Sequence, residues 1–372
     1  MASRSRNDRQ AVVIHSASAP RSHTVVTLHA LARKLADILR CNYGGHFEPG
    51  SGGTEALYHL PQTTFVGPGR LSSLGIVGEE GFFGGAVTWA HSATKAIVHP
   101  CVTPLAEAPE GWSDTFAERV RAVALPGYTA FGRKDVLEAG ARLAAHGRLR
   151  VKPVDADGGR DQAVVPDMGS LRRLIADMPE TTVSRGLVIE CNLDRPTTMS
   201  VGRVRVGTMA AAYVGTQQQT SNNRGETAYG GSRLFVVRGG FDELLRHPLP
   251  TEARLAIHQA RSFDEAADAS VPGLVASRRN YDVAQGVCAS GIWRSGVLEQ
   301  SWRSGGATAA ELLAIETFLN DDSISAVNVR TIETYGESPH IPDGAFVHFA
   351  GEDDEVGALA KYAVIEEVHH AR

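Results

Sequence analysis

Two acidic residues near the C-terminal quarter of the chain lie on a segment with the pattern of a tight β-hairpin. The Ser-Gly pair at residues 290–291 suits a two-residue turn, and strand pairing about that turn places Asp282 opposite Glu299. Because side chains alternate along a strand, Ser301 and Arg303 share the face of Glu299. Like charges that face each other destabilise a sheet, so we expect a cation between the two acids. A divalent metal ion is the simplest such cation.

A second interpretation of the same acids needs no metal. Arg279, Arg294 and Arg303 lie on or beside the expected strands, and any of them could pair with Asp282 or Glu299. An ordinary ion pair would then neutralise the acids. The residues alone leave both interpretations open.

A second group of residues, between positions 149 and 165, is suited to binding an anion. Lys152 lies near the end of an expected strand, and Gly158, Gly159 and Arg160 fall in the loop before the next strand. Glycines let backbone N–H groups approach an anion closely, and a lysine supplies a point charge for phosphate oxygens. A plain Gly-Gly hairpin would have the same sequence, so this alternative also stays open.

The composition is that of an ordinary globular protein. The chain has 372 residues, of which 42% are apolar and 21% charged, enough to bury a core in two or three packed lobes. A net charge of −5 gives no basic field for nucleic acid or anionic lipid. No apolar run reaches membrane-spanning length, and the run at 11–14 is too short for a signal peptide. We therefore expect a cytoplasmic protein without nucleic-acid or membrane partners.

The cysteines are scattered singly along the chain. None has Cys-x-x-Cys spacing, so the sequence indicates neither a zinc site nor a disulfide framework. We expect all four to be buried or idle thiols: Cys41, Cys101, Cys191 and Cys288.

Periodicity predicts the elements that must position these groups. The expected strands cover residues 11–15, 63–66, 86–89, 149–153, 162–165 and 186–190, and alternation resumes at 199–214. The expected helices cover residues 24–40, 134–146, 170–178, 251–268 and 308–319. Thr308 and Glu311 have the spacing of a capping box at the start of the last helix. Pro196 cannot continue a central ladder, which indicates a hinge after Glu190.

Alternating strands, helices and Gly- or Pro-containing connections predict a mixed α/β and α+β fold with three units. We expect an N-terminal α/β domain at residues 1–110, a small mobile subdomain at 111–196, and a C-terminal subdomain with the acidic hairpin at 197–372.

The order of these features resembles the ATP-grasp superfamily. The likeness consists of the Lys152-Pro strand, the Gly-Gly-Arg loop, the strand that ends in Glu190, and Glu299-Gln-Ser-Trp-Arg303. More closely, the chain resembles a bacterial family of ATP-grasp-like proteins sometimes labelled biotin-carboxylase-like, over about residues 60 to 320. The resemblance implies an ATP-grasp fold, in which two α+β subdomains close on ATP and follow an N-terminal α/β domain.

The resemblance also implies roles for single residues. The implied nucleotide-binding residues are Lys95, Lys152, Gly158, Gly159, Arg160, Glu190 and Leu193. In that assignment the lysines contact phosphates, the Gly-Gly-Arg loop forms a phosphate lid, and Glu190 and Leu193 flank the adenine. A surface lysine remains the alternative for Lys95.

The acidic hairpin matches the Glu-x-Asn-x-Arg metal and phosphate motif of the superfamily. Asp282, Glu299 and Ser301 would hold Mg²⁺, and Arg303 would join Lys152 in stabilising charge on the transferred phosphoryl group. The chain departs from the motif at Ser301, where asparagine is usual. A hydroxyl can ligate magnesium, but it is a weaker oxygen, which bears on a second metal position.

The resemblance implies an ATP- and Mg²⁺-dependent ligase that joins a small-molecule carboxylate to an amine or related nucleophile through an acyl phosphate. Polarity and proximity to the expected site nominate four residues for the acyl substrate: Asn222, Asn223, Arg233 and Arg279. Two alternatives are an ATP-binding regulatory or scaffold protein with weakened turnover, motivated by Ser301, and a biotin-carboxylase-like enzyme. A homodimer is left open.

Overall fold

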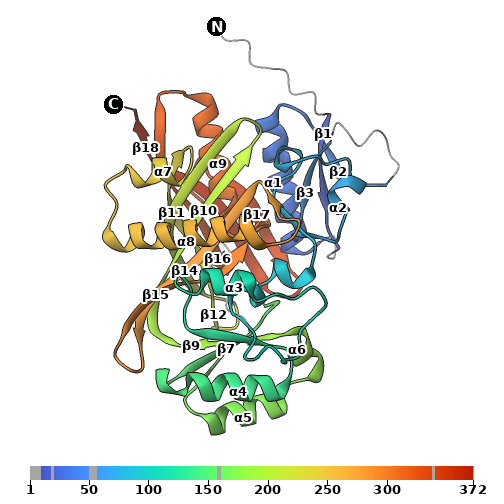
Figure 1. Ribbon diagram of the computed structural model, residues 1–372. Coiled ribbons are helices and arrows are strands. Elements are labelled where there is room, and N and C mark those ends of the chain that lie inside the picture. Colours follow the sequence, from blue (N-terminus) through green and yellow to red (C-terminus); the bar gives the residue numbers. More distant parts are fainter. Residues whose placement is uncertain (1–9, 18–20, 50–56, 157–160, 337–339, 372) are drawn as a thin grey trace.

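An eight-stranded antiparallel sheet forms the largest part of the structure (Figure 1). The computed structural model describes residues 10–17, 21–49, 57–156, 161–336 and 340–371. The strand order is β15-β14-β10-β11-β12-β16-β18-β17. The strands are β10 (Leu193–Val206), β11 (Met209–Ser221), β12 (Thr227–Arg238), β14 (Arg278–Cys288), β15 (Trp293–Ser301), β16 (Ile324–Tyr335), β17 (Phe346–Asp353) and β18 (Gly357–His370). The expected mixture of helices and sheets is confirmed.

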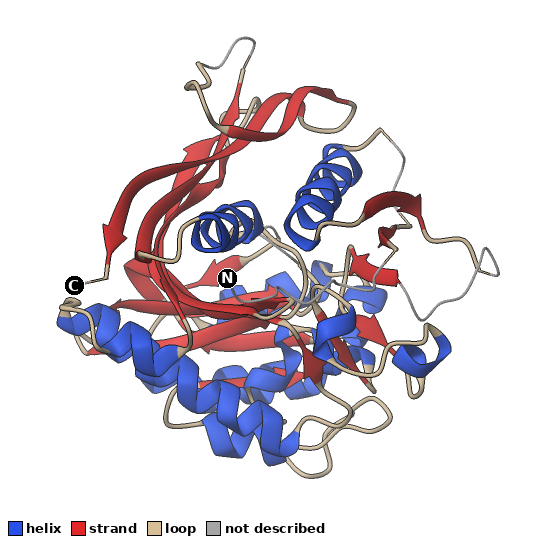
Figure 2. Cartoon of the chain, turned by 90° about the horizontal axis from the view of Figure 1, so that it is seen from above, coloured by secondary structure: helices blue, strands red, loops and turns tan. Residues whose placement is uncertain are grey.

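Helices cover both faces of this sheet. Figure 2 shows the sheet curving around a pair of helices, and the cores place α1 and α9 on one face and α3, α7 and α8 on the other. These helices are α1 (His23–Leu39), α3 (Thr115–Val120), α7 (Phe241–Leu245), α8 (Thr251–Ser270) and α9 (Thr308–Asn320). Because side chains alternate along β10, Val204 belongs to the core with α1 and α9, and Val201 to the core with α8.

The N-terminal part is a parallel sheet of order β2-β1-β3 that packs on α1. Its strands are β1 (Ala11–His15), β2 (Asn42–His46) and β3 (Leu57–Pro61). α1 forms because Leu28, Leu31 and Leu35 recur on one face, and because the Ser22 side chain accepts a hydrogen bond from the Val25 N–H. The predicted strand-loop-helix opening is confirmed. A small sheet joins β4 (Phe65–Val66), β5 (Gly85–Val87) and β13 (Val275–Ala276), and the four-residue helix α2 (Arg70–Ser73) lies between β4 and β5 in the chain.

A four-stranded antiparallel sheet of order β6-β9-β7-β8 forms the small unit at the bottom of Figure 1. Its elements are β6 (Gly127–Ala130), α4 (Arg133–Leu143), β7 (Leu149–Pro153), β8 (Ala163–Val165), α5 (Met168–Asp177), α6 (Glu180–Arg185) and β9 (Leu187–Cys191). α4 and α5 pack on the sheet through one apolar core. β7 is the strand that carries Lys152, and a single residue, Asn192, separates β9 from β10 of the large sheet.

The β14–β15 hairpin closes with a three-residue turn, so the expected two-residue turn is wrong. The Cys288 N–H donates to the Ile292 carbonyl at 3.0 Å, and the Gly291 N–H donates to the Cys288 carbonyl at 2.9 Å. Gly291 has a φ of 79°, a conformation that glycine adopts without a steric penalty. Val287 therefore faces Trp293, one residue out of the expected register.

A β-bulge at Leu298 restores the expected pairing further along the hairpin. Val283 faces Val297 and the next pair is Asp282 with Glu299, so Leu298 is the extra residue. The predicted pairing of the two acids is confirmed, although it results from two differences that cancel.

The start of α9 also differs from the expectation. Thr308 is the first helical residue rather than the cap, and its hydroxyl accepts a hydrogen bond from the Gly305 N–H at 2.9 Å. Glu311 does not reach back to the helix start but pairs with Arg278 on β14. The capping box is therefore wrong, because a buried guanidinium competes for the glutamate.

Two helical glycines in the small unit give opposite predictions for substitution by alanine. A methyl group at Gly140 in α4 would lie 2.2 Å from Leu171 Cδ2, inside the core between α4 and α5. Gly140→Ala should lower the free energy of unfolding by about 1–3 kcal/mol through overpacking. At Gly169 in α5 the nearest atom is 3.2 Å away, on the exposed Asp167 side chain. Gly169→Ala should raise stability by up to about 1 kcal/mol, because alanine favours helix. Urea unfolding of both variants checks this, and an equal loss in both would contradict the assigned close approach.

Candidate functional site

The two acids of the hairpin form one side of the candidate site. Asp282 Oδ1 accepts hydrogen bonds from Asn280 Nδ2 at 3.0 Å and from Ser200 Oγ at 3.4 Å. Burial, followed by the negative charge of Glu299, raises the pKa of Asp282 to about 6. Two facing carboxylates therefore form a site that favours a cation near neutral pH.

Lys95 supplies a cation to this acid pair from a distant part of the chain. It lies on the 3₁₀-helix η4 (Lys95–Val98), and its Nζ is 2.9 Å from Glu299 Oε2. The same Nζ donates to the carbonyl oxygen of Ala156, three residues after β7. Its side chain is only 4% exposed, so the interpretation of Lys95 as a surface lysine is wrong. The Lys95 ammonium group therefore links the segment after β7, the strand that bears Lys152, to the hairpin that bears the acids.

Lys152 and Glu190 form a buried ion pair between β7 and β9. Lys152 Nζ lies 2.5 Å from Glu190 Oε1, and His99 Nε2 lies 3.4 Å from Glu190 Oε2. All three side chains are under 5% exposed. Burial alone would raise the pKa of Glu190, but the Lys152 charge and the His99 hydrogen bond hold it at about 2. Sequence reasoning missed this pairing, because His99 follows no recognisable motif.

An apolar cluster lies beside this ion pair, where β9 passes into β10. It joins Cys191 and Leu193 to Ala284 and Cys288 of β14, and Leu298 of the bulge packs against it. Leu193 is therefore buried at the start of β10, and its implied contact with the adenine stays a prediction. Gly158, Gly159 and Arg160, expected to form the phosphate lid, lie outside the described residues.

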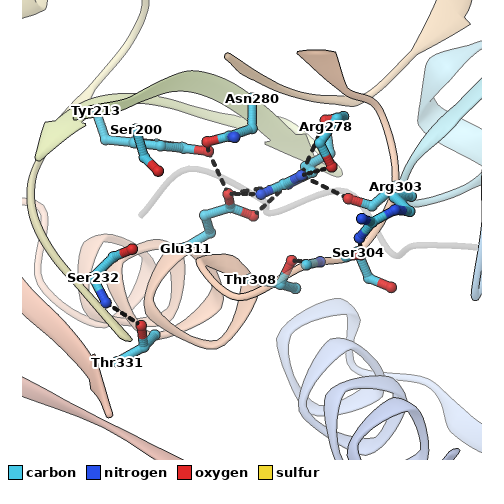
Figure 3. Close-up of polar contacts among 12 residues, drawn as sticks. Ser200, Tyr213, Ser232, Arg278, Asn280, Arg303, Ser304, Thr308, Glu311 and Thr331 are labelled. Atoms are coloured by element: carbon cyan, nitrogen blue, oxygen red, sulfur yellow. Dashed lines mark hydrogen bonds and ion pairs between the residues drawn. The ribbon is translucent and has the colours of Figure 1, made fainter. Parts of the chain in front are cut away.

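A buried network behind the acids ties the site to α9 (Figure 3). Arg278 donates to both carboxylate oxygens of Glu311, and Tyr213 OH donates to Glu311 Oε1 at 2.6 Å. The same hydroxyl lies 3.0 Å from Asn280 Oδ1, and Asn280 Nδ2 in turn donates to Asp282. Apart from Glu311, which was assigned to a capping box, no sequence pattern predicts this network.

The same arginine fixes the end of β15. Arg278 Nη1 donates to the Ser301 carbonyl at 3.0 Å, to Ser301 Oγ at 3.3 Å and to the Arg303 carbonyl at 2.7 Å. The Trp302 carbonyl accepts a hydrogen bond from Thr64 Oγ1 of the N-terminal part. Arg303 thus lies after the end of β15, on a loop held between the large sheet and the N-terminal part, and its Nη1 donates to the Ser304 carbonyl at 2.9 Å.

The four residues nominated for the acyl substrate do not join the acids. Arg279 lies on the opposite face of β14, because it is an odd number of residues from Asp282, and it pairs with Asp264 and Asp268 of α8. Arg233 pairs with Glu366 on the surface. Asn222 and Asn223 lie in the turn after β11, where Asn223 donates to carbonyls of the β17–β18 turn. The expected proximity of these four residues to the acid pair is therefore wrong.

Arg294 does not hold the acids either. Its Nη2 lies 3.3 Å from His146 Nδ1, near the hairpin tip. The arginine ion pairs expected for Arg279 and Arg294 are replaced by partners on other elements.

The donor set fits magnesium. Asp282, Glu299 and Ser301 offer two carboxylates and a hydroxyl on adjacent strands, and hard oxygen ligands are those that Mg²⁺ prefers. Within the described part of the chain, no group of three or more His, Cys, Asp or Glu side chains could hold a metal. Two carboxylates nevertheless suit Mg²⁺, which usually keeps waters and takes further oxygens from substrate phosphates.

A family model described as "Protein of unknown function (DUF3182)" matches residues 12–363. The chain belongs to this family. No curated protein matches the chain. Within the described residues, no helix of this family member has the length and apolar character to cross a membrane.

Several solved structures are similar to the chain at low identity. D-alanyl-alanine synthetase A from Vibrio cholerae is 11% identical, with 84% of this chain and 94% of that chain covered and a TM-score of 0.48. A biotin carboxylase complex from Campylobacter jejuni is 11% identical, with 96% and 87% covered and a TM-score of 0.47. Phosphoribosylamine–glycine ligase from Thermotoga maritima is 12% identical, with 95% and 91% covered and a TM-score of 0.47. A proposal of function has to rest on this chain's own residues.

The raised pKa of Asp282 predicts a pH-dependent stability. A folded-state pKa of about 6, against about 3.9 unfolded, means that ionisation opposes folding. The penalty is absent below pH 4 and complete above pH 6. Without metal, Asp282→Asn should therefore exceed the wild type in unfolding free energy by about 1–3 kcal/mol at pH 7.5, and match it at pH 4. Urea unfolding at both pH values measures this, with the exposed Asp37→Asn as the control. A difference that does not vary with pH would refute the assignment.

The Lys152–Glu190 pair predicts strong coupling between its partners. Lys152→Met leaves the Glu190 carboxylate buried beside His99 alone and should cost about 3–5 kcal/mol of unfolding free energy. Adding Glu190→Gln removes the stranded charge and should recover at least half of that loss.

The matched control for this cycle is Lys34→Met, which breaks the more exposed pair with Glu316 and should cost less than about 1 kcal/mol. A double-mutant cycle in urea provides the coupling. Simple addition of the Lys152 and Glu190 effects would show that the pair is not formed.

Proposed function

We propose that the chain is a Mg²⁺-dependent ligase of the ATP-grasp type. It would transfer the γ-phosphoryl group of ATP to a small-molecule carboxylate and then join the acyl group to an amine or related nucleophile. The single observation that carries the proposal is the double contact of Lys95. Its ammonium group contacts Glu299 on the acidic hairpin and the Ala156 carbonyl beyond the Lys152 strand. The segment with Lys152 and the acidic hairpin therefore come together at Lys95, as they must if both are to bind the phosphates of one nucleotide.

The nucleotide would lie along the face that these groups share. The apolar cluster with Leu193 and Leu298, next to the polar Glu190, suits a purine base. Lys152 and Lys95 would bind phosphate oxygens, because flexible ammonium groups pair well with them. Lys95 would leave Glu299 as the phosphates arrive.

The acids would complete phosphate binding from the opposite side. Asp282, Glu299 and Ser301 would hold Mg²⁺, which would neutralise the charge of the phosphates. In the first step a carboxylate oxygen of the substrate attacks the γ-phosphorus, and ADP leaves. In the second step the nucleophile attacks the acyl carbon, and phosphate leaves. Arg303 would stabilise the charge on the transferred group in both steps.

One observation favours a second candidate function, a protein that binds MgATP without turnover. Arg278 Nη1 lies 3.3 Å from Ser301 Oγ, so the hydroxyl that stands in place of asparagine already accepts a hydrogen bond. A ligand oxygen shared in this way binds a metal less strongly, which would weaken phosphoryl transfer more than nucleotide binding.

The proposal predicts that MgATP stabilises the folded chain. At a concentration one hundred times the dissociation constant, the unfolding free energy should rise by about 2.7 kcal/mol. Glu299→Gln should abolish this gain, and so should Lys152→Met/Glu190→Gln, which removes the phosphate lysine without leaving a buried charge. Glu316→Gln, on the far pair with Lys34, should keep it. Thermal melts with and without MgATP measure the gain, and an equal response of all variants would show that the site is assigned wrongly.

Turnover separates the two candidate functions. ADP release should require Mg²⁺ and both substrates when the chain is screened against a panel of carboxylates and amines. A chain that gains stability from MgATP, yet releases no ADP with any pair, would support the non-catalytic candidate.

A further inference from the structure

Two cysteines meet where the small sheet joins the large one. Cys191 is the last residue of β9 and Cys288 the last residue of β14, and Leu193 is the strand partner of Cys288. Both belong to the apolar cluster where β9 passes into β10, and Cys288 is a neighbour of Cys191 there. Both residues are buried, at 1% and 2% exposure. Elements far apart in the sequence thus place two thiols in one buried cluster.

This pair of thiols spans the junction between two parts of the molecule. Cys191 belongs to the four-stranded sheet that carries Lys152, whereas Cys288 belongs to the hairpin that carries the metal acids. Further contacts hold the hairpin tip against the small unit: Arg294 reaches His146, and Gly147 has no room for a methyl group beside Ala289. Any rotation of the small unit against the large sheet must therefore move one sulfur relative to the other.

The two thiols differ in reactivity. Cys288 Sγ lies 3.0 Å from Ser290 Oγ in the turn. Although burial opposes it, hydrogen bonds from Ser290 and Arg294 lower the pKa of Cys288 to about 7. Burial, then the neighbouring Cys288, raises the pKa of Cys191 to about 12. Cys288 is thus the nucleophile and Cys191 the second thiol.

The position of Cys288 also favours attack by a small oxidant. It lies directly beneath the hairpin turn, and residues 289–293 are all exposed. Burial and the carboxylates of Asp114 and Asp135 raise the pKa of Cys101 to about 12, so that thiol lacks thiolate character. Reactivity toward oxidants requires both thiolate character and access. Cys288 combines a lowered pKa with a neighbouring thiol, and only the exposed turn separates this buried residue from solvent.

We propose that Cys191 and Cys288 are an oxidation site, at which a peroxide forms a disulfide that locks the small unit against the acidic hairpin. The Cys288 thiolate attacks one peroxide oxygen, the O–O bond breaks, and a sulfenic acid forms as hydroxide leaves. The Cys191 sulfur then attacks the Cys288 sulfur, the S–S bond forms, and the S–O bond breaks. The departing oxygen takes the Cys191 proton and leaves as water. Two thiols are oxidised and one peroxide is reduced to two waters.

The lock goes beyond the proposed ligase function and does not require it. In a ligase that closes on its nucleotide, a covalent bond across this junction would hold the two ribbons at one separation and impede opening or closing. The bond would be reversible by a thiol reductant, so it would act as a redox-controlled stop.

The first experiment tests the bond itself. The reduced full-length chain is treated with a small excess of hydrogen peroxide, and free thiols are counted after denaturation. The count should fall from four to two and return to four with dithiothreitol. Peptide mapping without reduction should link residues 191 and 288 within one monomer. A count that stays at four, a link to another cysteine, or a link between two chains would overturn the proposal.

Cysteine variants assign the order of events. Cys191→Ser should stop the reaction at a Cys288 sulfenic acid, which dimedone traps. Cys288→Ser should show no peroxide-dependent loss of thiols. The matched control Cys41→Ser, in the N-terminal part, should still lose two thiols. Trapping at Cys191 instead of Cys288 would overturn the assigned chemistry.

The second experiment tests the lock without any nucleotide. Amide hydrogen exchange at residues 190–193 should slow at least tenfold in the oxidised chain, because local opening at the junction is prevented. Unchanged exchange in a chain with the mapped disulfide would overturn the lock.

A further measurement rests on the proposed function. Oxidation should weaken MgATP binding at least tenfold in the wild type but not in Cys191→Ser. If the reduced chain binds no MgATP, the proposed function fails, whereas the thiol count and the exchange data still decide the redox site.

Discussion

The placement of two carboxylates opposite each other on neighbouring strands is the constraint on which the rest of the site depends. Asp282 and Glu299 repel each other when both are ionised, and burial together with the Glu299 charge raises the pKa of Asp282. The cation in the structure is Lys95, which comes from the segment between the N-terminal part and the small unit. Through Lys95, the negative charge of the acid pair connects the acidic hairpin, the segment that bears Lys95 and, at Ala156, the small unit.

Burying the other charged pairs of the site costs free energy, and packing alone does not explain why the chain has them. Lys152 with Glu190 and Arg278 with Glu311 are almost fully buried, and apolar residues of similar volume would often be as stable or more so. What these pairs do provide is fixed geometry. Arg278 holds the end of β15 and the start of α9 at once, so the oxygens of Ser301 keep a defined position.

Local sequence patterns predicted much of the fold but few of the contacts between residues of the site. α1 and the Lys152 strand follow from periodicity, and the acid pair was found, although the assumed turn was wrong and the unforeseen bulge compensated for it. The contacts of Lys95 and Glu311 join residues far apart in the sequence, which no local pattern encodes. Arg279 shows how sensitive such reasoning is to strand phase, because a shift by one residue sends a side chain to the opposite face.

The bulge at Leu298 changes what a single strand can present to a ligand. In a regular strand, neighbouring residues point to opposite faces, but here Leu298 packs on the cluster with Ala284 while Glu299 faces Asp282 on the same side of the sheet. An apolar contact and an acidic contact therefore come from adjacent residues, whose Cα atoms are held about 3.8 Å apart by the peptide bond. In the proposed ligase, β15 would therefore hold the contact of Leu298 with the base and the contact of Glu299 with the phosphate side at a fixed separation. Neither residue can move without the other.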